Sequence, residues 1–169
     1  AMSRLLQPAQ QHDLHQAARM QTWRRAVESD IGGNDALHSQ SIESREVRAL
    51  MREAGAQGAR IVHFPEGAIC FPSKFVMSVD GPDAVGPADW DRCQWPVLQS
   101  ELAAIAELAR ELRLWTVIAS VHRLTGPNRP HSSLYVISDL AGVATRYDER
   151  LLSKTKVSYM YSPGVSPVT

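Results

Sequence analysis

The chain has 169 residues, of which 44% are hydrophobic, so it is long enough to bury the core of one domain. Its 18 basic and 18 acidic residues cancel, which argues against a dedicated nucleic-acid-binding protein. No apolar run approaches the ~20 residues of a membrane span, and the N-terminus lacks the basic-then-apolar order of a secretory signal. We therefore expect a globular, cytoplasmic protein that binds neither nucleic acid nor membrane.

The cysteine content argues against both a disulfide framework and a metal site. Cys70 and Cys93 are the only two cysteines, and neither has a second cysteine or a histidine at the spacing of metal ligands. We expect both to be ordinary thiols and the protein to hold no metal.

The N-terminal third of the chain predicts an arm, a short strand and a helix. Residues 1–21 are rich in glutamine and begin with an Ala-Met typical of an expression scar, so we expect an arm before a domain over residues 22–169. A strand candidate at 23–28 precedes a turn-rich segment. From Ser41 to Ala54 apolar residues recur at intervals of three and four, which predicts an amphipathic helix closed by Gly55 or Gly58.

A β-branched run at residues 59–64 predicts a buried strand, which Pro65 ends because proline donates no hydrogen bond to a neighbouring strand. Glu66 therefore lies at the strand's carboxyl end. The proline-rich stretch that follows is too long for a plain connection and is predicted to be a functional loop. The later elements expected are that loop at 67–96, a helix at 97–112, an interior strand at 114–121, hairpin strands at 133–138 and 142–147, and an irregular segment to residue 164.

This order of elements predicts an α/β layer with a mixed sheet. Ligands and catalytic groups collect at the carboxyl ends of strands in such sheets. Glu66 is thus either a catalytic carboxylate or an ordinary surface glutamate in a turn. His122 and His131, which flank the loop between them, either line a pocket or are solvated.

Four segments in order resemble the nitrilase, or carbon-nitrogen hydrolase, superfamily from about Arg24 to Thr169. They are GARIVHFPEGA (58–68), LWTVIASVHRL (114–124), HSSLYVISDLAGVATRYDERLL (131–152) and YMYSPG (159–164). The resemblance implies half of a four-layer α-β-β-α sandwich and a homodimer or larger homo-oligomer. It also implies a hydrolase of amides, nitriles or carbamoyl compounds that uses a Glu-Lys-Cys triad and no cofactor.

In the chemistry implied by this resemblance, a cysteine thiolate attacks carbon, a glutamate is the general base, and a lysine stabilises the oxyanion. Glu66 takes the general-base position. The family's lysine normally lies two residues after a tyrosine, but Glu149 stands two residues after Tyr147. Lys156 stands where many members carry a second glutamate. Relative to the family, the lysine and the second glutamate have therefore exchanged positions.

The exchange has a structural and a functional interpretation. In the first, a reversed ion pair neutralises itself without catalytic meaning. In the second, Lys156 supplies the cation from the other side of the cleft and Glu149 replaces the second carboxylate. We favour the structural interpretation, because oxyanion stabilisation tolerates little misplacement.

The family's nucleophile lies beyond the Pro-Gly segment, and neither Cys70 nor Cys93 occupies its position. We therefore expect a chain truncated before its nucleophile and inactive by itself, with an open sheet edge and an apolar face that need a partner. The alternative is a catalytically silent scaffold or interaction module.

Overall fold

The computed structural model describes residues 36–69, 78–80, 86–140 and 142–165, and the side chains of its first helix from residue 44 onward. All of these residues belong to one compact unit, residues 36–169. The domain boundary at residues 21 and 22 and the strand at 23–28 lie outside the described residues and stay predictions.

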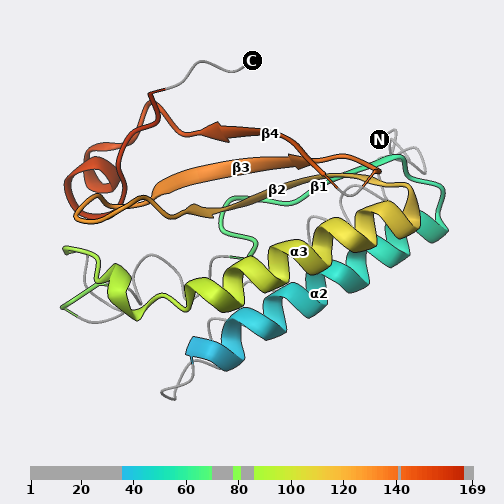
Figure 1. The fold of residues 1–169 in the computed structure, drawn as a ribbon, viewed down its shortest axis with the longest axis horizontal. Helices are drawn as coiled ribbons and strands as arrows, with labels where there is room; N and C mark the ends of the chain where they lie inside the picture. Colours follow the sequence, from blue (N-terminus) through green and yellow to red (C-terminus); the bar gives the residue numbers. More distant parts are fainter. Residues whose placement is uncertain (1–35, 70–77, 81–85, 141, 166–169) are drawn as a thin grey trace, which may run out of the picture. The chain divides into compact units, whose positions relative to one another are not determined.

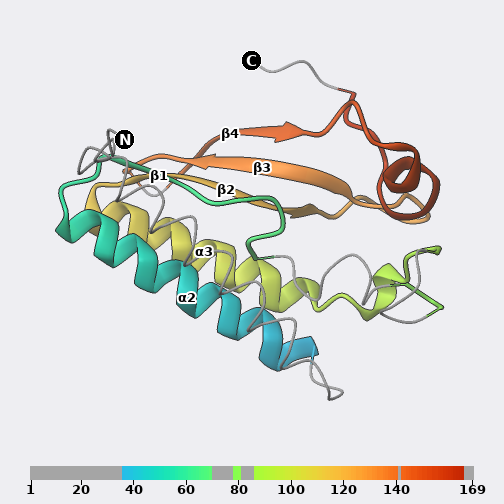
Figure 2. The same cartoon turned by 180° about the vertical axis from the view of Figure 1, so that it is seen from behind.

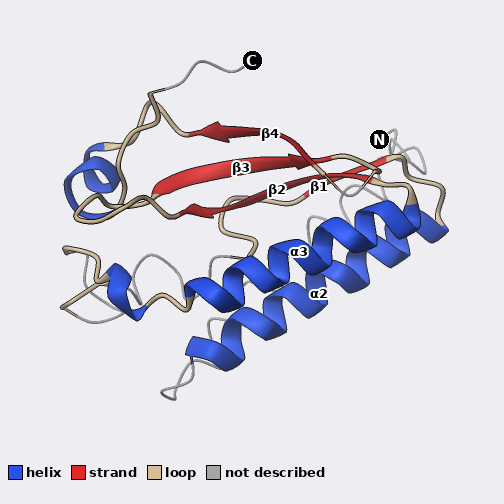
Figure 3. Cartoon of the chain, in the orientation of Figure 1, coloured by secondary structure: helices blue, strands red, loops and turns tan. Residues whose placement is uncertain are grey.

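Four strands form one mixed sheet in the order β1-β2-β3-β4. Two long helices lie side by side against one face of it, as both views show (Figures 1 and 2). This arrangement, coloured by element type in Figure 3, confirms the predicted α/β class. The elements are α2 (Ala36–Ala56), β1 (Ile61–His63), η1 (Trp90–Arg92), α3 (Trp95–Leu112), β2 (Trp115–His122), β3 (His131–Ile137), β4 (Val143–Asp148) and η2 (Lys156–Met160).

The helices form where apolar residues recur at helical spacing. Val47 and Met51 of α2 and Ile105 of α3 are buried, as the amphipathic pattern predicted. The helix α2 begins five residues before the predicted start at Ser41. It is followed by Gly58 at φ 81°, a left-handed conformation that glycine adopts without steric cost.

The sheet combines one parallel and two antiparallel pairings. The strand β1 runs parallel to β2, whereas β2, β3 and β4 form an antiparallel meander. The predicted hairpin is confirmed, with strands shifted by one or two residues. A parallel pair brings the carboxyl end of β1 alongside that of β2, which sets the place of Glu66.

The prediction that residues 59–64 form a buried strand is wrong in extent and burial. The strand β1 has three residues, and the Ile61 side chain is 61% exposed. Its register partner Trp115 is 38% exposed, so both lie on a face of the sheet that the described residues leave partly open. In contrast, residues of the opposite face alternate as buried positions along β3. Apolar composition predicted the strand, but burial depends on what covers it.

Ser120 of β2 carries a hydroxyl that is buried without a hydrogen-bond partner among the described residues. Its register partner on β3, Ser133, instead donates to Asp148 at 2.6 Å. A buried polar group without a partner costs free energy, whereas a bonded one does not. We expect Ser120→Ala to leave the free energy of unfolding unchanged or to raise it by up to ~1 kcal/mol, and Ser133→Ala to lower it by ~1 kcal/mol.

Urea unfolding of the two variants measures this difference. The two substitutions are matched, because each replaces a serine by an alanine and so removes one oxygen atom. A Ser120→Ala variant as destabilised as Ser133→Ala would mean that the Ser120 hydroxyl has a partner in solution.

Candidate functional site

The three residues singled out in the sequence lie together in the structure. The Lys156 Nζ is 2.7 Å from Glu66 Oε1 and 2.7 Å from Glu149 Oε2. The carboxylates come from different parts of the sheet, since Glu66 follows β1 and Glu149 follows β4. We call this group the Lys156 cluster.

Each carboxylate is placed by the end of its strand. The Phe64 N–H donates to Val117 O at 2.9 Å and continues the β1–β2 pairing by one residue, after which Pro65 has no N–H to donate. Glu66 follows at once. The Glu149 N–H donates to Ser132 O at 2.9 Å, so that residue extends the β3–β4 pairing in the same way.

Lys156 begins η2, a π-helical turn in the segment that the sequence predicted to be irregular. Two hydrogen bonds from outside hold the turn: Arg129 Nη2 donates to Val157 O at 2.7 Å, and Trp90 Nε1 donates to Met160 O at 2.7 Å. The external bonds fix the backbone from which the Lys156 side chain extends.

The lysine is the most enclosed member of the cluster. Its side chain is 12% exposed, against 28% for Glu149 and 55% for Glu66. Burial by itself lowers the pKa of Lys156, but the hydrogen bonds that its ammonium donates to the Glu149 and Glu66 carboxylates outweigh burial and raise that pKa above its ordinary value. The ammonium therefore stays protonated at neutral pH. An ammonium has three donors, and these two contacts use two of them.

The geometry bears on the two interpretations of the charge exchange. A reversed ion pair requires contact between Lys156 and Glu149 alone. Lys156 also contacts Glu66, the residue at the general-base position. The cluster thus joins one cation to both carboxylates, and the catalytic roles of its members stay predictions.

The other candidate residues lie elsewhere. Cys93 is a buried thiol between η1 and α3 and does not belong to the cluster. Cys70 lies outside the described residues. Among those described, no group of three histidine, cysteine or acidic side chains is placed to hold a metal. Nor is any helix in the described ranges long and apolar enough to cross a membrane.

The two histidines flank the β2–β3 loop, as the sequence predicted, and each is the terminal residue of the adjoining strand. His122 ends β2 and pairs in register with His131 at the start of β3. His122 Nδ1 lies 3.0 Å from Tyr135 Oη, and His131 Nδ1 lies 2.8 Å from Ser162 O. The strands extend one or two residues beyond their predicted ends, and this brings both histidines into the sheet.

Asp148 anchors the end of β4, directly before Glu149. Arg146 contacts its carboxylate with two hydrogen bonds, at 2.8 and 3.0 Å, and Ser133 donates to it as well. Burial by itself raises the pKa of Asp148, but these bonds outweigh it and hold that pKa below its ordinary value. The network fixes the backbone that carries Glu149.

We expect Asp148→Asn to lower the free energy of unfolding by about 1 kcal/mol at pH 7. Because the folded-state pKa is depressed, the carboxylate's contribution is present above the unfolded value of ~3.9 and is lost as pH falls through the folded value. The difference in the free energy of unfolding between variant and parent should therefore decrease below about pH 4. Urea unfolding at several pH values checks this, with Asp139→Asn in the β3–β4 turn as the control. A stability difference between Asp148→Asn and the parent that does not change with pH would contradict the prediction.

Solved structures with the same fold include members of the nitrilase superfamily. An amidase of that superfamily from Nesterenkonia AN1, solved as a cysteine-to-alanine mutant, matches with a TM-score of 0.59 and 13% identity over 76% of this chain and 44% of its own. The glutamine-dependent NAD+ synthetase from Acinetobacter baumannii matches with a TM-score of 0.55 and 15% identity over 75% of this chain and 22% of its own. This chain thus spans less than half of the length of either protein.

No curated protein matches the chain in sequence. The family model described as "Carbon-nitrogen hydrolase" matches residues 4–168, nearly the entire chain. The mixed sheet with its helices agrees with that match, as do the structural neighbours. The chain belongs to the carbon-nitrogen hydrolase family, within the nitrilase superfamily.

Proposed function

We propose that this chain carries the general base and the cation of a hydrolase that cleaves non-peptide C–N bonds in amides, nitriles or carbamoyl compounds. Glu66 is the general base and Lys156 is the cation. The observation that carries the proposal is the Lys156 Nζ at 2.7 Å from Glu66 Oε1 in a cluster that also holds Glu149. The family's chemistry needs a cation within reach of the general base.

The proposed roles follow from the chemistry of each group. Glu66 accepts the proton of a cysteine thiol, the thiolate attacks the substrate carbon, and the same carboxyl returns the proton to the departing nitrogen. The third N–H of the Lys156 ammonium, which neither carboxylate uses, donates a hydrogen bond to the developing oxyanion and stabilises its negative charge. Glu149 keeps the lysine protonated and holds it in position. Water then cleaves the acyl-enzyme thioester, with Glu66 again as base.

We propose that the nucleophilic cysteine comes from outside these 169 residues and that the chain is inactive alone. Cys93 is buried and is not part of the cluster. The Nesterenkonia amidase, which this chain covers over 44% of its length, was also solved with an acetamide moiety added covalently at its active-site cysteine. The homo-oligomer and the cytoplasmic location expected from the sequence are part of the same proposal.

A catalytically silent scaffold is the second candidate function. It is favoured by Glu149 at the position of the family's lysine, because a carboxylate there cannot stabilise an oxyanion. The two candidates differ in turnover. A scaffold predicts no ammonia release from any form of the protein.

The test is ammonia release from amides, nitriles and N-carbamoyl compounds, with the isolated chain and with a longer polypeptide that adds the cysteine-bearing part of the domain. We expect none from the isolated chain. In the longer form, Glu66→Gln and Lys156→Ala should each lower kcat about 100-fold or more. The control is Lys154→Ala, an exposed lysine two residues away. Full turnover by Lys156→Ala would refute the role of the cation, and an inactive longer form would favour the scaffold.

A further inference from the structure

A network of polar side chains crosses three neighbouring strands on one face of the sheet. Ser133 and Tyr135 of β3 pair in register with Asp148 and Arg146 of β4. Because successive residues of a strand point to opposite faces, these four side chains share one face. His122, the last residue of β2, joins them there, since its Nδ1 lies 3.0 Å from Tyr135 Oη. We call these five residues the His122 network.

The guanidinium of Arg146 lies against the imidazole ring of His122. Its Nη1 is 3.0 Å from Nδ1 and 2.9 Å from Nε2 of that ring. A guanidinium has donors and no acceptor, so a ring nitrogen can bond it only through a lone pair. Neutral imidazole has one such lone pair and imidazolium has none, and imidazolium would also place a second cation beside the first. The contact therefore requires a neutral His122.

The surroundings of His122 favour its neutral form at pH 7. Partial burial and, after it, the charge of Arg146 hold the pKa of His122 below its ordinary value, while Asp148 raises that pKa and His131 lowers it by smaller amounts. Burial raises the pKa of the Tyr135 hydroxyl, so this neighbour stays neutral as well. The ring of His122 therefore gains its proton only as the pH falls below neutral.

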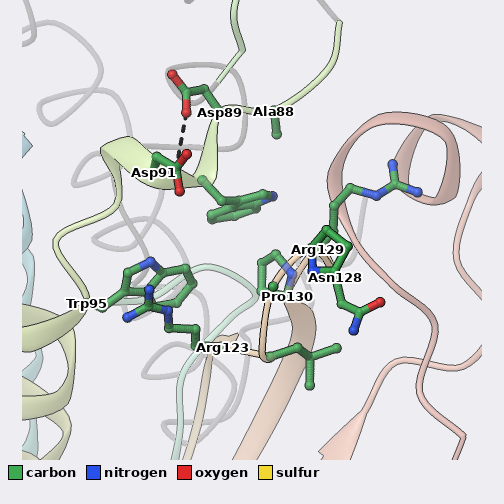
Figure 4. A pocket seen from close by; sticks show the side chains of 12 residues that line it. Ala88, Asp89, Asp91, Trp95, Arg123, Asn128, Arg129 and Pro130 are labelled. Atoms are coloured by element: carbon green, nitrogen blue, oxygen red, sulfur yellow. Dashed lines mark hydrogen bonds between the residues drawn. The ribbon is translucent and has the colours of Figure 1, made fainter.

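Arg123, the residue after His122, is held by a different partner. Its guanidinium lies 5.4 Å from the centroid of the Trp95 ring. Both residues line an open pocket of about 360 Å³ between the segments 88–95 and 123–130, where Figure 4 shows them together. The guanidinium that contacts the His122 ring is that of Arg146.

Arg146 also connects His122 to the Lys156 cluster. While its Nη1 contacts His122, its Nε and Nη2 donate to the two carboxylate oxygens of Asp148 at 2.8 and 3.0 Å. Glu149 is the next residue, and the alternation of side chains directs it to the other face of the sheet. There its Oε2 lies 2.7 Å from Lys156 Nζ. One strand end thus carries the His122 network on one face and a carboxylate of the Lys156 cluster on the other.

We propose that His122 is a positioning residue that makes the site sensitive to pH. When neutral, it holds Arg146 and thereby the backbone of Asp148 and Glu149; when protonated, it repels Arg146 and loosens that backbone. Glu149 then loses its fixed contact with Lys156, and the site weakens in mild acid. The consequence for catalysis rests on the proposed function, whereas the effect on the backbone does not.

The test is hydrogen exchange of the Glu149 amide in the 169-residue chain, followed by NMR. This N–H donates to Ser132 O at 2.9 Å, so its protection factor, corrected for the intrinsic pH dependence of exchange, reports how firmly the strand end is held. We expect the factor to fall about tenfold as His122 gains its proton between about pH 7.5 and 5. The Trp115 N–H, which donates to Arg60 O, should keep its protection. Protection that is constant at Glu149, or lost equally at both amides, overturns the proposal.

Variants assign the effect to His122 and Arg146. His122→Gln should remove the pH dependence at Glu149, because glutamine offers an acceptor at every pH in this range; His122→Asn replaces it if circular dichroism shows that it is not folded. Arg146→Gln should give low protection at every pH and a higher His122 pKa, since the opposing cation is gone. Arg110→Gln, which breaks an exposed pair with Glu107 on α3, is the matched control and should behave as the parent. Protection that still falls in acid in the non-titrating variant also overturns the proposal.

The outcome is separable from that of the proposed function, because hydrogen exchange needs no turnover. In a longer, active form, kcat should fall more in mild acid in the parent than in His122→Gln. If no form releases ammonia but the protection of Glu149 depends on His122, the role of His122 stands and the hydrolase fails. If ammonia is released while Glu149 keeps its protection in mild acid, the hydrolase stands and the role of His122 fails.

Discussion

Replacing Lys156 with glutamate should lower the free energy of unfolding by about 2–4 kcal/mol, the largest effect of any single charge change at the site. The side chain is 12% exposed and contacts two carboxylates, so the variant places a third negative charge beside them at the most enclosed position of the cluster. The matched control is Lys154→Glu, which makes the same change of charge on an exposed side chain of the same segment and should cost below ~1 kcal/mol.

The double change Glu149→Lys with Lys156→Glu should recover most of the stability that Lys156→Glu loses. It restores one cation and two carboxylates to the cluster and places the lysine where the family normally carries it. Urea unfolding of the parent, both single variants and the double variant measures the coupling between the two positions. A double variant no more stable than Lys156→Glu would show that the cluster does not form in solution.

The pH dependence of the cluster has the sign expected for a lysine with partners. The folded-state pKa of Lys156 is raised, so its contribution to stability is present below the unfolded value of ~10.4 and is lost as pH rises through the folded value. The free energy of unfolding of Lys156→Glu should therefore differ most from that of the parent near neutral pH, and the difference should be smaller in strong base.

Gly164→Ala is the second change expected to have a large effect, about 2–4 kcal/mol. A Cβ at Gly164 would clash with the backbone oxygen of Asp148 and lie 2.7 Å from Asp148 Cβ, closer than real Cβ atoms approach their neighbours. The Gly164 N–H donates to Glu149 O at 2.9 Å, so the clash falls on the backbone that carries Glu149. The strand end and the turn that follows Lys156 cannot both keep their places.

Gly126→Ala is the control for this change, because its Cβ would meet no atom within 4 Å. Thermal or urea unfolding compares the two variants. The Lys156 pKa provides a second measurement, since displacement of Glu149 should lower it. Equal stability of Gly164→Ala and Gly126→Ala would contradict the close packing of the Pro-Gly turn on β4.

Much of the fold was predictable because its signals are local. The helical spacing of Val47 and Met51 marks α2, and the hairpin follows from two β-rich runs around a short turn. Glu66 was identified for the same reason, since Pro65 ends a strand through its own chemistry. The resemblance to the family then supplied Glu149 and Lys156 as positions to compare.

The contact between Lys156 and Glu66 was not predictable, because the two residues are distant in the sequence and follow strands at opposite edges of the sheet. The π turn that carries Lys156 has no local pattern; its carbonyls are held by Arg129 and Trp90 from other segments. The exposure of Ile61 was missed because an apolar run reports composition and not what covers it. The pocket likewise depends on two loops that meet only in the fold.

The measurement that tests the central claim most directly is an NMR titration of the Lys156 side chain. The chain has three lysines, Lys74, Lys154 and Lys156, so the spectrum is simple, and a Lys156→Arg variant assigns the signal. We predict a Lys156 pKa above the ordinary lysine value in the parent and a lower one in Glu66→Gln, because that change removes one of its two carboxylates. A Lys156 pKa that Glu66→Gln leaves unchanged would contradict the contact between cation and general base on which the proposed function depends.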